Sequence, residues 1–247
     1  MIKTFIQKIF LFFNFKVINL KKDKSNLDQF LKELIPVDNP LIFDVGANIG
    51  QSIRKFKKIF PNSIIHSFET DDDAFKILHK NYSNNKTINL NLFGLGSKNE
   101  CLEFYSYRDS GKSSFYKLNL NTKFIKYKSE ALGIDQHKYL NKIYKKEIKT
   151  IDTYCEEKII KKINFLKIDT QGFEENVIKG SSKMLKNNLI DVIQLEIIFS
   201  SVYEKSNNIY DVEKNLIPFG YKLFGTSHYG NLLTDQNWQC DFIYISN

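Results

Sequence analysis

Short apolar runs alternate with amphipathic stretches through most of the chain, and this alternation constrains the fold more than any other feature of the sequence. The apolar runs predict strands at 41–46, 63–69, 88–94, 101–107, 164–169, 191–198, 221–226 and 240–246. Strands separated by helices form βαβ units, whose parallel sheet is covered on both faces. The last two runs have no helix between them, so we expect an antiparallel ribbon at one edge. The pattern therefore predicts an α/β protein with a mostly parallel sheet, and leaves the polar segment 108–146 unassigned.

Length and charge divide the chain into two unequal parts. A chain of 247 residues is long enough for one large α/β domain, and we assign residues 37–247 to it and residues 1–36 to an N-terminal extension. The formal net charge is +8, and five lysines without an acid lie in residues 1–22. Only Arg54 and Arg108 are arginines, whereas base reading and phosphate clamping rely on arginine. No nucleic-acid partner is therefore expected.

The N-terminal segment 1–22 is apolar and basic. A helix there can lie in a membrane interface with its lysines facing anionic lipid, or it can pack on the domain or on a partner subunit; both alternatives stay open. A signal peptide is disfavoured because Asn14 and Lys16 interrupt the run and no small-residue cleavage site follows.

The helix predicted over 27–35 carries a core-packing pattern. The three cysteines are widely spaced, so we expect a reduced, cytoplasmic chain without a structural metal, peripheral on the membrane if segment 1–22 binds lipid.

A glycine-containing loop, residues 44–50, follows the first predicted strand and opens a helix. Gly46 lets the backbone turn sharply, and Gly50 lets helix and strand approach each other. A dinucleotide loop would have glycine where this chain has Asn48 and Gln51, which disfavours a pyrophosphate ligand. The loop instead suits an adenosine ligand without a phosphate. An ordinary strand-to-helix turn is the alternative.

Glu69 ends the second predicted strand, 23 residues after Gly46. A carboxylate at this place can accept hydrogen bonds from both hydroxyls of a ribose. The alternative is a charge at a helix N-terminus, a role for which residues 71–73 are better suited. Together, the glycine loop and this carboxylate indicate an adenosine site more strongly than either does alone.

The chain resembles the FkbM family of S-adenosylmethionine-dependent methyltransferases over residues 37–247. The segments that carry the resemblance are FDVGANIG (43–50), SFET (67–70), NLFGLGSKNE (91–100), SGKSSF (110–115), EIKTIDTYCEE (147–157), FLKIDTQGFEENVIKG (165–180) and VIQLE (192–196). The resemblance implies a class I methyltransferase fold, which is Rossmann-like with seven strands, and S-adenosylmethionine as cofactor. It places Glu69 on the ribose, Gly94 and Leu95 beside the adenine, and around the methionine part the loop residues Asp44, Gly46, Ala47, Asn48 and Gly50. Gln171 replaces a glutamate that is frequent in the family, so the site has one acid fewer and no metal is assigned.

In that fold the strand that ends at Asp169 lies next to the strand that ends at Asp44, which brings Asp169 close to the transferred methyl. A hydroxyl is a poor nucleophile unless a base takes its proton, and Asp169 is the first candidate for this base. Holding the methionine ammonium or a metal, or capping a helix, are the alternatives. Glu196, at the end of the next strand, is the second catalytic candidate.

Three further residues are candidates for the acceptor pocket, namely Ser114, Glu174 and His228. No NPPY-like tetrad follows Asp169, which disfavours methylation of a base amino group. The resemblance and the basic, apolar N-terminus favour O-methylation of a hydroxyl, on a sugar of a bacterial surface glycan or its lipid-linked precursor. Methylation of a polyketide or another small secondary metabolite, and a binding protein without catalysis, are the alternatives.

Overall fold

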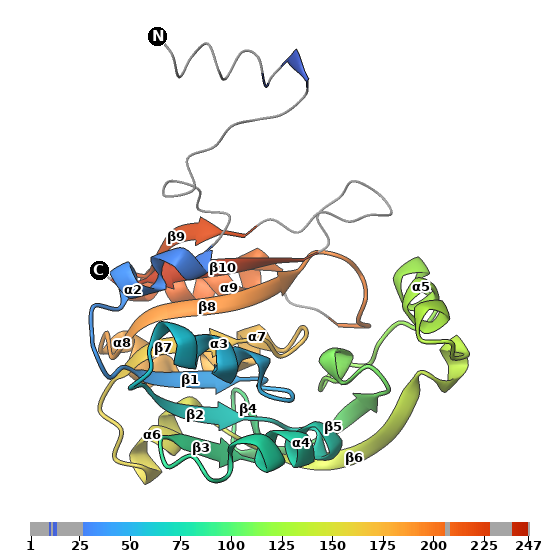
Figure 1. Cartoon of the computed structure of the whole chain (residues 1–247), viewed down its shortest axis with the longest axis horizontal. Coiled ribbons are helices and arrows are strands. Elements are labelled where there is room, and N and C mark those ends of the chain that lie inside the picture. The colour runs from blue at the N-terminus through green and yellow to red at the C-terminus, as the bar shows by residue number, and fades with distance from the viewer. Residues whose placement is uncertain (1–9, 11, 14–26, 206–207, 228–238, 247) are drawn as a thin grey trace.

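The computed structural model describes residues 10, 12–13, 27–205, 208–227 and 239–246. Its centre is a seven-stranded sheet in the order β3-β2-β1-β7-β8-β10-β9 (Figure 1). The strands are β1 (Leu41–Val45), β2 (Ile64–Phe68), β3 (Ile88–Asn91), β7 (Ile163–Ile168), β8 (Ile190–Ile198), β9 (Lys222–Thr226) and β10 (Gln239–Ile245). β10 pairs antiparallel with β8 and β9, and the other pairs are parallel. The predicted mostly parallel sheet with its antiparallel last strand is confirmed.

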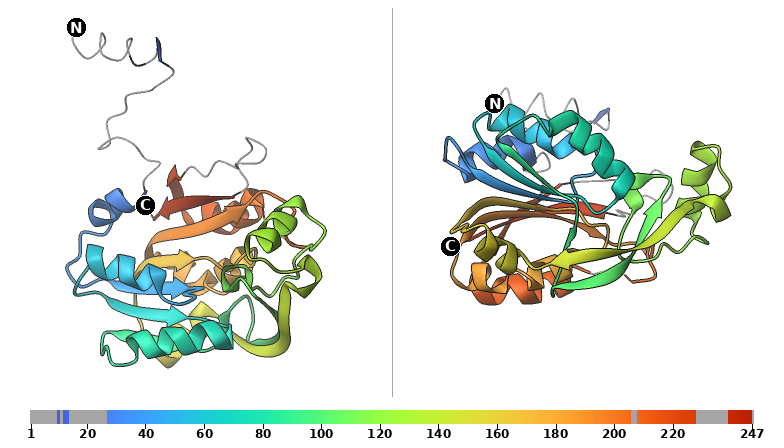
Figure 2. Two further views of the ribbon diagram at one scale, coloured as in Figure 1. Left: turned by 45° about the vertical axis from the view of Figure 1, so that its right-hand side comes forward. Right: turned by 90° about the horizontal axis from the view of Figure 1, so that it is seen from below.

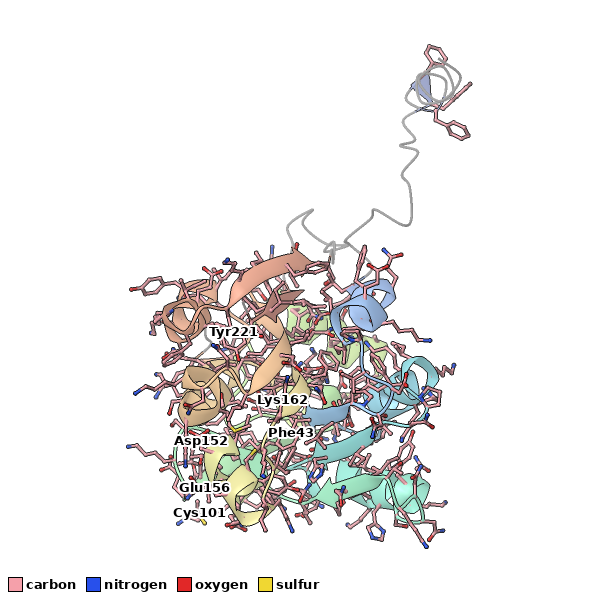
Figure 3. The ribbon with its side chains drawn as sticks, turned by 90° about the vertical axis from the view of Figure 1, so that its left-hand side faces the viewer. Phe43, Cys101, Asp152, Glu156, Lys162 and Tyr221 are labelled. Carbon is pink, nitrogen blue, oxygen red and sulfur yellow. The ribbon has the colours of Figure 1, made fainter. Side chains whose placement is uncertain are left out.

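Helices cover both faces of this sheet (Figure 2). One face carries α2 (Leu31–Leu34), α3 (Gln51–Ile59) and α4 (Asp72–Tyr82), and the other carries α6 (Ile151–Glu157), α7 (Glu174–Lys179), α8 (Ser182–Lys186) and α9 (Ile209–Leu216). Because neighbouring residues of a strand point to opposite faces, Ile42 joins the core under α3 while Phe43 joins the core under α6 and α7. Phe43 lies in the interior (Figure 3) and is fully buried.

Residues 27–35 pack on the α3 face, as their sequence pattern predicts. They form a 3-10 turn, η2 (Leu27–Phe30), followed by α2. Leu27, Leu31 and Ile35 are buried against the α3-side core. This short helical segment therefore contributes packing to the domain.

The predicted single strand over 88–94 is wrong in detail, because two sheets divide it. β3 ends at Asn91, and β4 (Gly94–Leu95) belongs to a second sheet with β5 (Glu100–Tyr107) and β6 (Leu140–Lys149). A Cβ on Gly94 would lie 2.6 Å from the ring of Phe115, so this turn needs a residue without a side chain. β5 and β6 pair antiparallel, which confirms the added antiparallel strand. The unassigned segment contributes η3 (Ser110–Lys112), α5 (Lys123–Ala131), η4 (Gln136–Lys138) and β6.

In the described ranges no helix is long and apolar enough to cross a membrane. Most of segment 1–22 lies outside the described residues, so membrane contact through it stays a prediction. The three cysteines are free: Cys101 is exposed (Figure 3), and Cys155 and Cys240 are buried.

Candidate active site

The glycine loop lies at the carboxyl ends of three neighbouring strands of the main sheet, β2, β1 and β7. β1 is central, with Val45 beside Phe68 of β2 and Ile168 of β7. Gly46 has φ +81°, and a Cβ on it would lie 1.9 Å from the carbonyl oxygen of Asp169. Only glycine combines this left-handed backbone with so close an approach. The predicted neighbourhood of the Asp44 and Asp169 strands is confirmed by the pairing of β1 with β7.

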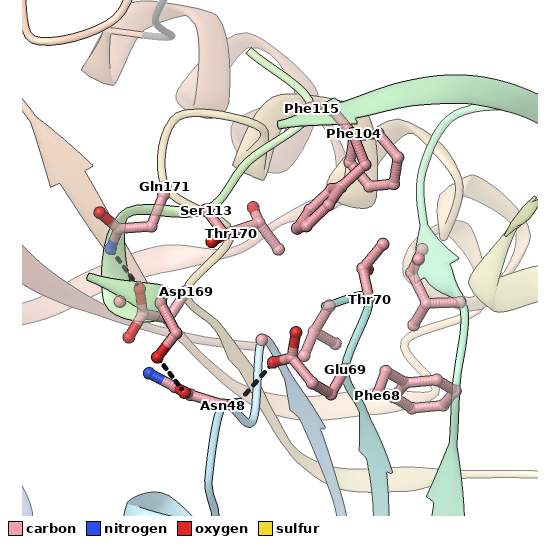
Figure 4. Close-up of a pocket in the computed structure, with 16 residues that line it drawn as sticks. Asn48, Phe68, Glu69, Thr70, Phe104, Ser113, Phe115, Asp169, Thr170 and Gln171 are labelled. Carbon is pink, nitrogen blue, oxygen red and sulfur yellow. Dashed lines mark hydrogen bonds between the residues drawn. The ribbon is translucent and has the colours of Figure 1, made fainter. Parts of the chain in front are cut away.

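A first cleft of about 600 Å³ opens above these strand ends (Figure 4). Its walls are apolar on the side of the second sheet, from Phe104 and Phe115, and polar on the side of β1 and β7. The lining residues are Val45, Gly46, Asn48, Phe68, Glu69, Thr70, Gly94, Leu95, Phe104, Ser110, Gly111, Ser113, Phe115, Asp169, Thr170 and Gln171. Most of the predicted cofactor residues are therefore brought together in one cleft of the size of a small-molecule site.

Glu69 joins the glycine loop to the end of β2. Its Oε2 accepts a hydrogen bond from the backbone N–H of Asn48 at 2.6 Å, and its Oε1 accepts one from the N–H of Asp71, also at 2.6 Å. The side chain is almost buried, and burial raises the pKa of Glu69 to about 7. Asp71 accepts the N–H groups of Asp73 and Ala74, so it caps α4 and leaves Glu69 to face the cleft.

Asp169 is held by charge and by a hydrogen bond. Its Oδ2 lies 3.2 Å from Nζ of Lys167, and its Oδ1 accepts a hydrogen bond from Nε2 of Gln171 at 2.8 Å (Figure 4). The Lys167 ammonium, the larger of the favourable influences, and the Gln171 amide keep the pKa of Asp169 below its usual value against the effect of burial. Asp169 is therefore a carboxylate at neutral pH. Lys167, which lies in the site, is not singled out by the sequence, because a lysine near a strand end gives no local signal.

Lys167 also balances a second acid beneath the loop. Its Nζ lies 3.6 Å from Oδ1 of Asp44, which is completely buried and accepts the hydroxyl of Ser52. Burial raises the pKa of Asp44. Asp44 lines neither this cleft nor the second one described below, so the structure places it under the glycine loop.

Gln171 connects four segments of the chain. Its Nε2 donates to Asp169 and, at 2.8 Å, to Oε2 of Glu196, while its Oε1 accepts from Nζ of Lys112 at 3.0 Å and from the hydroxyl of Tyr203 at 3.2 Å. Burial, with the Asp169 charge nearby, raises the pKa of Glu196 to about 8. Lys112 and Tyr203 were also missed, since their segments meet Gln171 only in the folded chain.

Two of the predicted acceptor residues lie behind the loop 170–172. The hydroxyl of Ser114 donates to the carbonyl oxygen of Gln171 at 2.9 Å. Oε1 of Glu174 accepts from the N–H groups of Thr170 at 2.9 Å and Gly172 at 3.2 Å. Both side chains are buried and line neither cleft. His228, the third candidate, lies outside the described residues.

A second cleft, of about 790 Å³, opens on the α3 side of Asp169. Gly46, Asn48 and Asp169 line both clefts. The other lining residues of the second cleft are Ala47, Gln51, Ser52, Lys55, Lys167, Gln194, Glu196 and Asp241. Gly50 lies behind the loop, where φ +95° and contact with the Tyr82 ring require glycine. The two catalytic candidates, Asp169 and Glu196, therefore both face the second cleft.

Residues 44–223 match the model of the family described as Methyltransferase FkbM domain. The chain belongs to the FkbM family of methyltransferases. It is 24% identical over 168 residues to the 2-O-methyltransferase NoeI of Sinorhizobium fredii, covering 67% of this chain and 68% of that protein. It is 27% identical over 153 residues to Methyltransferase 1 of Beauveria bassiana, covering 58% of this chain and 59% of that protein.

The crystal structure of methyltransferase FkbM from Methylobacillus flagellatus KT shares the fold of this FkbM-family chain. The two structures superpose with a TM-score of 0.53 at 16% identity, over 84% of this chain and 44% of that chain. The present chain thus spans less than half of that longer protein. Membership of the FkbM family implies dependence on S-adenosylmethionine. In the part of the chain that the structure describes, no group of three or more His, Cys, Asp or Glu side chains is arranged to hold a metal ion.

Proposed function

We propose that this chain transfers the methyl group of S-adenosylmethionine to a hydroxyl of a sugar. The observation that carries the proposal is the position of Asp169, a carboxylate where two clefts of different chemistry meet. The similarity to a protein named as a 2-O-methyltransferase supports oxygen as the acceptor atom. A sugar of a bacterial surface glycan or of its lipid-linked precursor is the acceptor we propose.

The first cleft fits the cofactor. Its apolar walls, formed by Phe68, Leu95, Phe104 and Phe115, suit an adenine ring. Each carboxylate oxygen of Glu69 accepts one backbone N–H and has capacity for another donor, which suits two ribose hydroxyls. The glycine loop packs closely on the backbone of Asp169, and the part of the first cleft that Gly46, Asn48 and Asp169 line is where we place the methionine part.

Asp169 is the proposed base. S-adenosylmethionine, when bound, supplies a methyl carbon on a cationic sulfur. The acceptor oxygen attacks this carbon, the carbon–sulfur bond breaks with its electron pair going to sulfur, and S-adenosylhomocysteine leaves. Asp169 accepts the hydroxyl proton as that oxygen forms its new bond, since a free hydroxyl is a weak nucleophile. Lys167 and Gln171 fix the orientation of the carboxylate from two sides. Alignment of the acceptor provides most of the acceleration in such a displacement.

A transfer assay with methyl-labelled cofactor tests the proposed function. Purified protein is incubated with a surface-glycan extract, a lipid-linked glycan fraction, a phenolic secondary-metabolite extract and bulk RNA. Label is expected in a glycan or lipid-linked glycan fraction and absent from the RNA. Transfer to the phenolic extract alone would contradict the sugar assignment, and transfer to none of the four would contradict the activity.

Affinity for S-adenosylhomocysteine is expected to fall as the pH falls through 7. The ionised Glu69 accepts hydroxyl donors more strongly than the neutral acid, and burial raises its pKa to about 7. Between pH 8 and pH 6 its ionised fraction falls about tenfold, and the affinity with it. Titration calorimetry at both pH values measures this, with the 2′,3′-dideoxy analogue as control. Identical pH profiles for the two ligands would contradict the role of Glu69.

The same raised pKa has the opposite effect on the unliganded protein. The native state binds this proton more tightly than the unfolded chain, whose glutamates titrate near their ordinary value of 4.5. The contribution of Glu69 to the free energy of unfolding is therefore present at low pH and is lost as the pH rises through about 7. Opposite pH trends for stability and for ligand affinity are expected from this one side chain.

A further inference from the structure

On the α3 face, three neighbouring strands change from apolar to polar side chains as they approach their ends at the second cleft. β7 carries Phe165 and Lys167, and Asp169 follows directly after its end; β8 carries Val192, Gln194 and Glu196. Alternate residues of a strand share a face, so these side chains point to the same side. β10 continues the row, since its Asp241 pairs with Glu196 and its Ile243 with Gln194. The second cleft therefore lies at the polar end of an otherwise apolar layer of side chains between the sheet and α3.

One polar atom in this cleft is left without a partner by the fold. Gln194 is 4% exposed, and its Oε1 has no hydrogen-bond partner among the described residues. Leaving a buried carbonyl oxygen unpaired costs about 1–3 kcal/mol. Nearby, Nε2 of Gln239 donates to Oε1 of Glu196 at 2.7 Å, and this amide aligns the carboxylate from the side of β10. A buried acceptor that faces a cleft indicates a ligand that brings a hydrogen-bond donor.

The charges in the cleft define the ligand further. The carboxylates of Asp169 and Asp241 line it, together with Glu196, whose pKa of about 8 makes it mostly a neutral acid at pH 7. Its two lysines already have acidic partners: Lys55 pairs with Asp28 at 3.0 Å, and Lys167 with Asp169 at 3.2 Å. An anionic ligand would therefore meet like charge. None of the described residues that line this cleft is aromatic, so a planar phenol finds no ring to stack on.

We propose that the second cleft is the acceptor subsite and that it takes an uncharged sugar unit, whose hydroxyls donate to Oε1 of Gln194 and to the carboxylate of Asp241 and lie beside the carboxyl group of Glu196. This inference rests on the proposed function, because it requires the first cleft for the cofactor. It explains why Asp169 lines both clefts: the carboxylate faces the acceptor hydroxyl from one side and the cofactor from the other. It also makes Gln194 and Asp241 determinants of acceptor specificity.

The test measures sugar binding to the full chain saturated with S-adenosylhomocysteine, by saturation-transfer NMR. The probes are methyl α-D-glucopyranoside, methyl α-D-mannopyranoside and methyl α-L-rhamnopyranoside, each at millimolar concentration, with glucuronic acid and catechol for comparison. At least one neutral glycoside is expected to bind. Gln194→Leu, which keeps the size but removes the buried oxygen, is expected to weaken that binding about 3- to 10-fold, as loss of one neutral hydrogen bond does.

Two further variants complete the design. Asp241→Asn, which keeps the shape of its side chain, is expected to weaken binding of the same glycoside, and Gln136→Leu, on η4 away from both clefts, is expected to leave it unchanged. Equal glycoside binding by Gln194→Leu and the parent, preferred binding of glucuronic acid or catechol, or no binding of any neutral glycoside would overturn the inference. Failure of the parent to bind S-adenosylhomocysteine would overturn the proposed function itself, and this is measured first.

Discussion

Gly46→Ala is expected to abolish cofactor binding and to destabilise the protein. At φ +81° a residue with a Cβ pays about 1–2 kcal/mol for the left-handed backbone. The new Cβ would also lie 1.9 Å from the carbonyl oxygen of Asp169, so β1 and β7 must separate or the loop must move. We expect S-adenosylhomocysteine affinity at least ~100-fold weaker, equivalent to about 2.8 kcal/mol. The melting temperature should fall by about 4 °C or more.

Gly133→Ala is the matched control for this substitution. Gly133 also has a positive φ, +65°, but an added Cβ would meet nothing within 4 Å. The control should therefore show only the backbone strain, with unchanged S-adenosylhomocysteine affinity. If Gly46→Ala bound the ligand as tightly as Gly133→Ala does, the close approach of loop and Asp169 would have no part in the cofactor site.

Asp169→Asn is expected to lower kcat by about 10²- to 10⁴-fold, which is the usual contribution of a positioned general base. The amide keeps the size of the side chain but cannot accept the hydroxyl proton. S-adenosylhomocysteine affinity should stay near that of the parent. If Asp169 instead holds the methionine ammonium, the loss of a charged hydrogen bond, about 1.5–3 kcal/mol, should appear in the affinity, with kcat less affected. Single-turnover rates and calorimetry on the same preparation separate the two roles.

Asp73→Asn is the control for Asp169→Asn, because Asp73 is an exposed carboxylate that pairs with Lys76 and Lys142 on the surface. Its kcat is expected to match that of the parent. Full activity of Asp169→Asn would remove Asp169 from the mechanism. A large loss of melting temperature in Asp169→Asn, which the unbalanced Lys167 can cause, is measured separately so that it is not counted as lost catalysis.

Much of the main sheet could be predicted because each strand is specified locally. The runs that become β1, β2, β7 and β8 are mostly apolar and bounded by helix signals, as expected for strands buried on both faces. The turn at Gly46 and the acid at Glu69 follow directly after such runs. The position of β7 beside β1, by contrast, came from the family resemblance and not from any local pattern.

The parts that were not predicted depend on contacts between distant segments. β5 and β6 are separated by more than thirty residues, and β6 contains four lysines. Because β6 is so polar, it does not show the alternation of apolar and polar residues that would indicate a strand. The sequence predicts one strand over 88–94, because the change to the second sheet at Gly94 comes from pairing with Ile148 of the distant β6. The same applies to the site: Glu174 and Ser114 are polar in sequence, yet their partners are the backbone of loop 170–172.

Thermal unfolding with and without S-adenosylhomocysteine tests the central claim, that the cleft lined by Gly46, Glu69 and Asp169 binds this cofactor. NAD is the control, since it shares the adenosine but carries a pyrophosphate. A ligand at ~100 times its dissociation constant adds about 2.7 kcal/mol, which is about 5–11 °C for a domain of this size. The account predicts a shift of this order with S-adenosylhomocysteine and none with NAD. A shift with NAD alone, or with neither ligand, would contradict it.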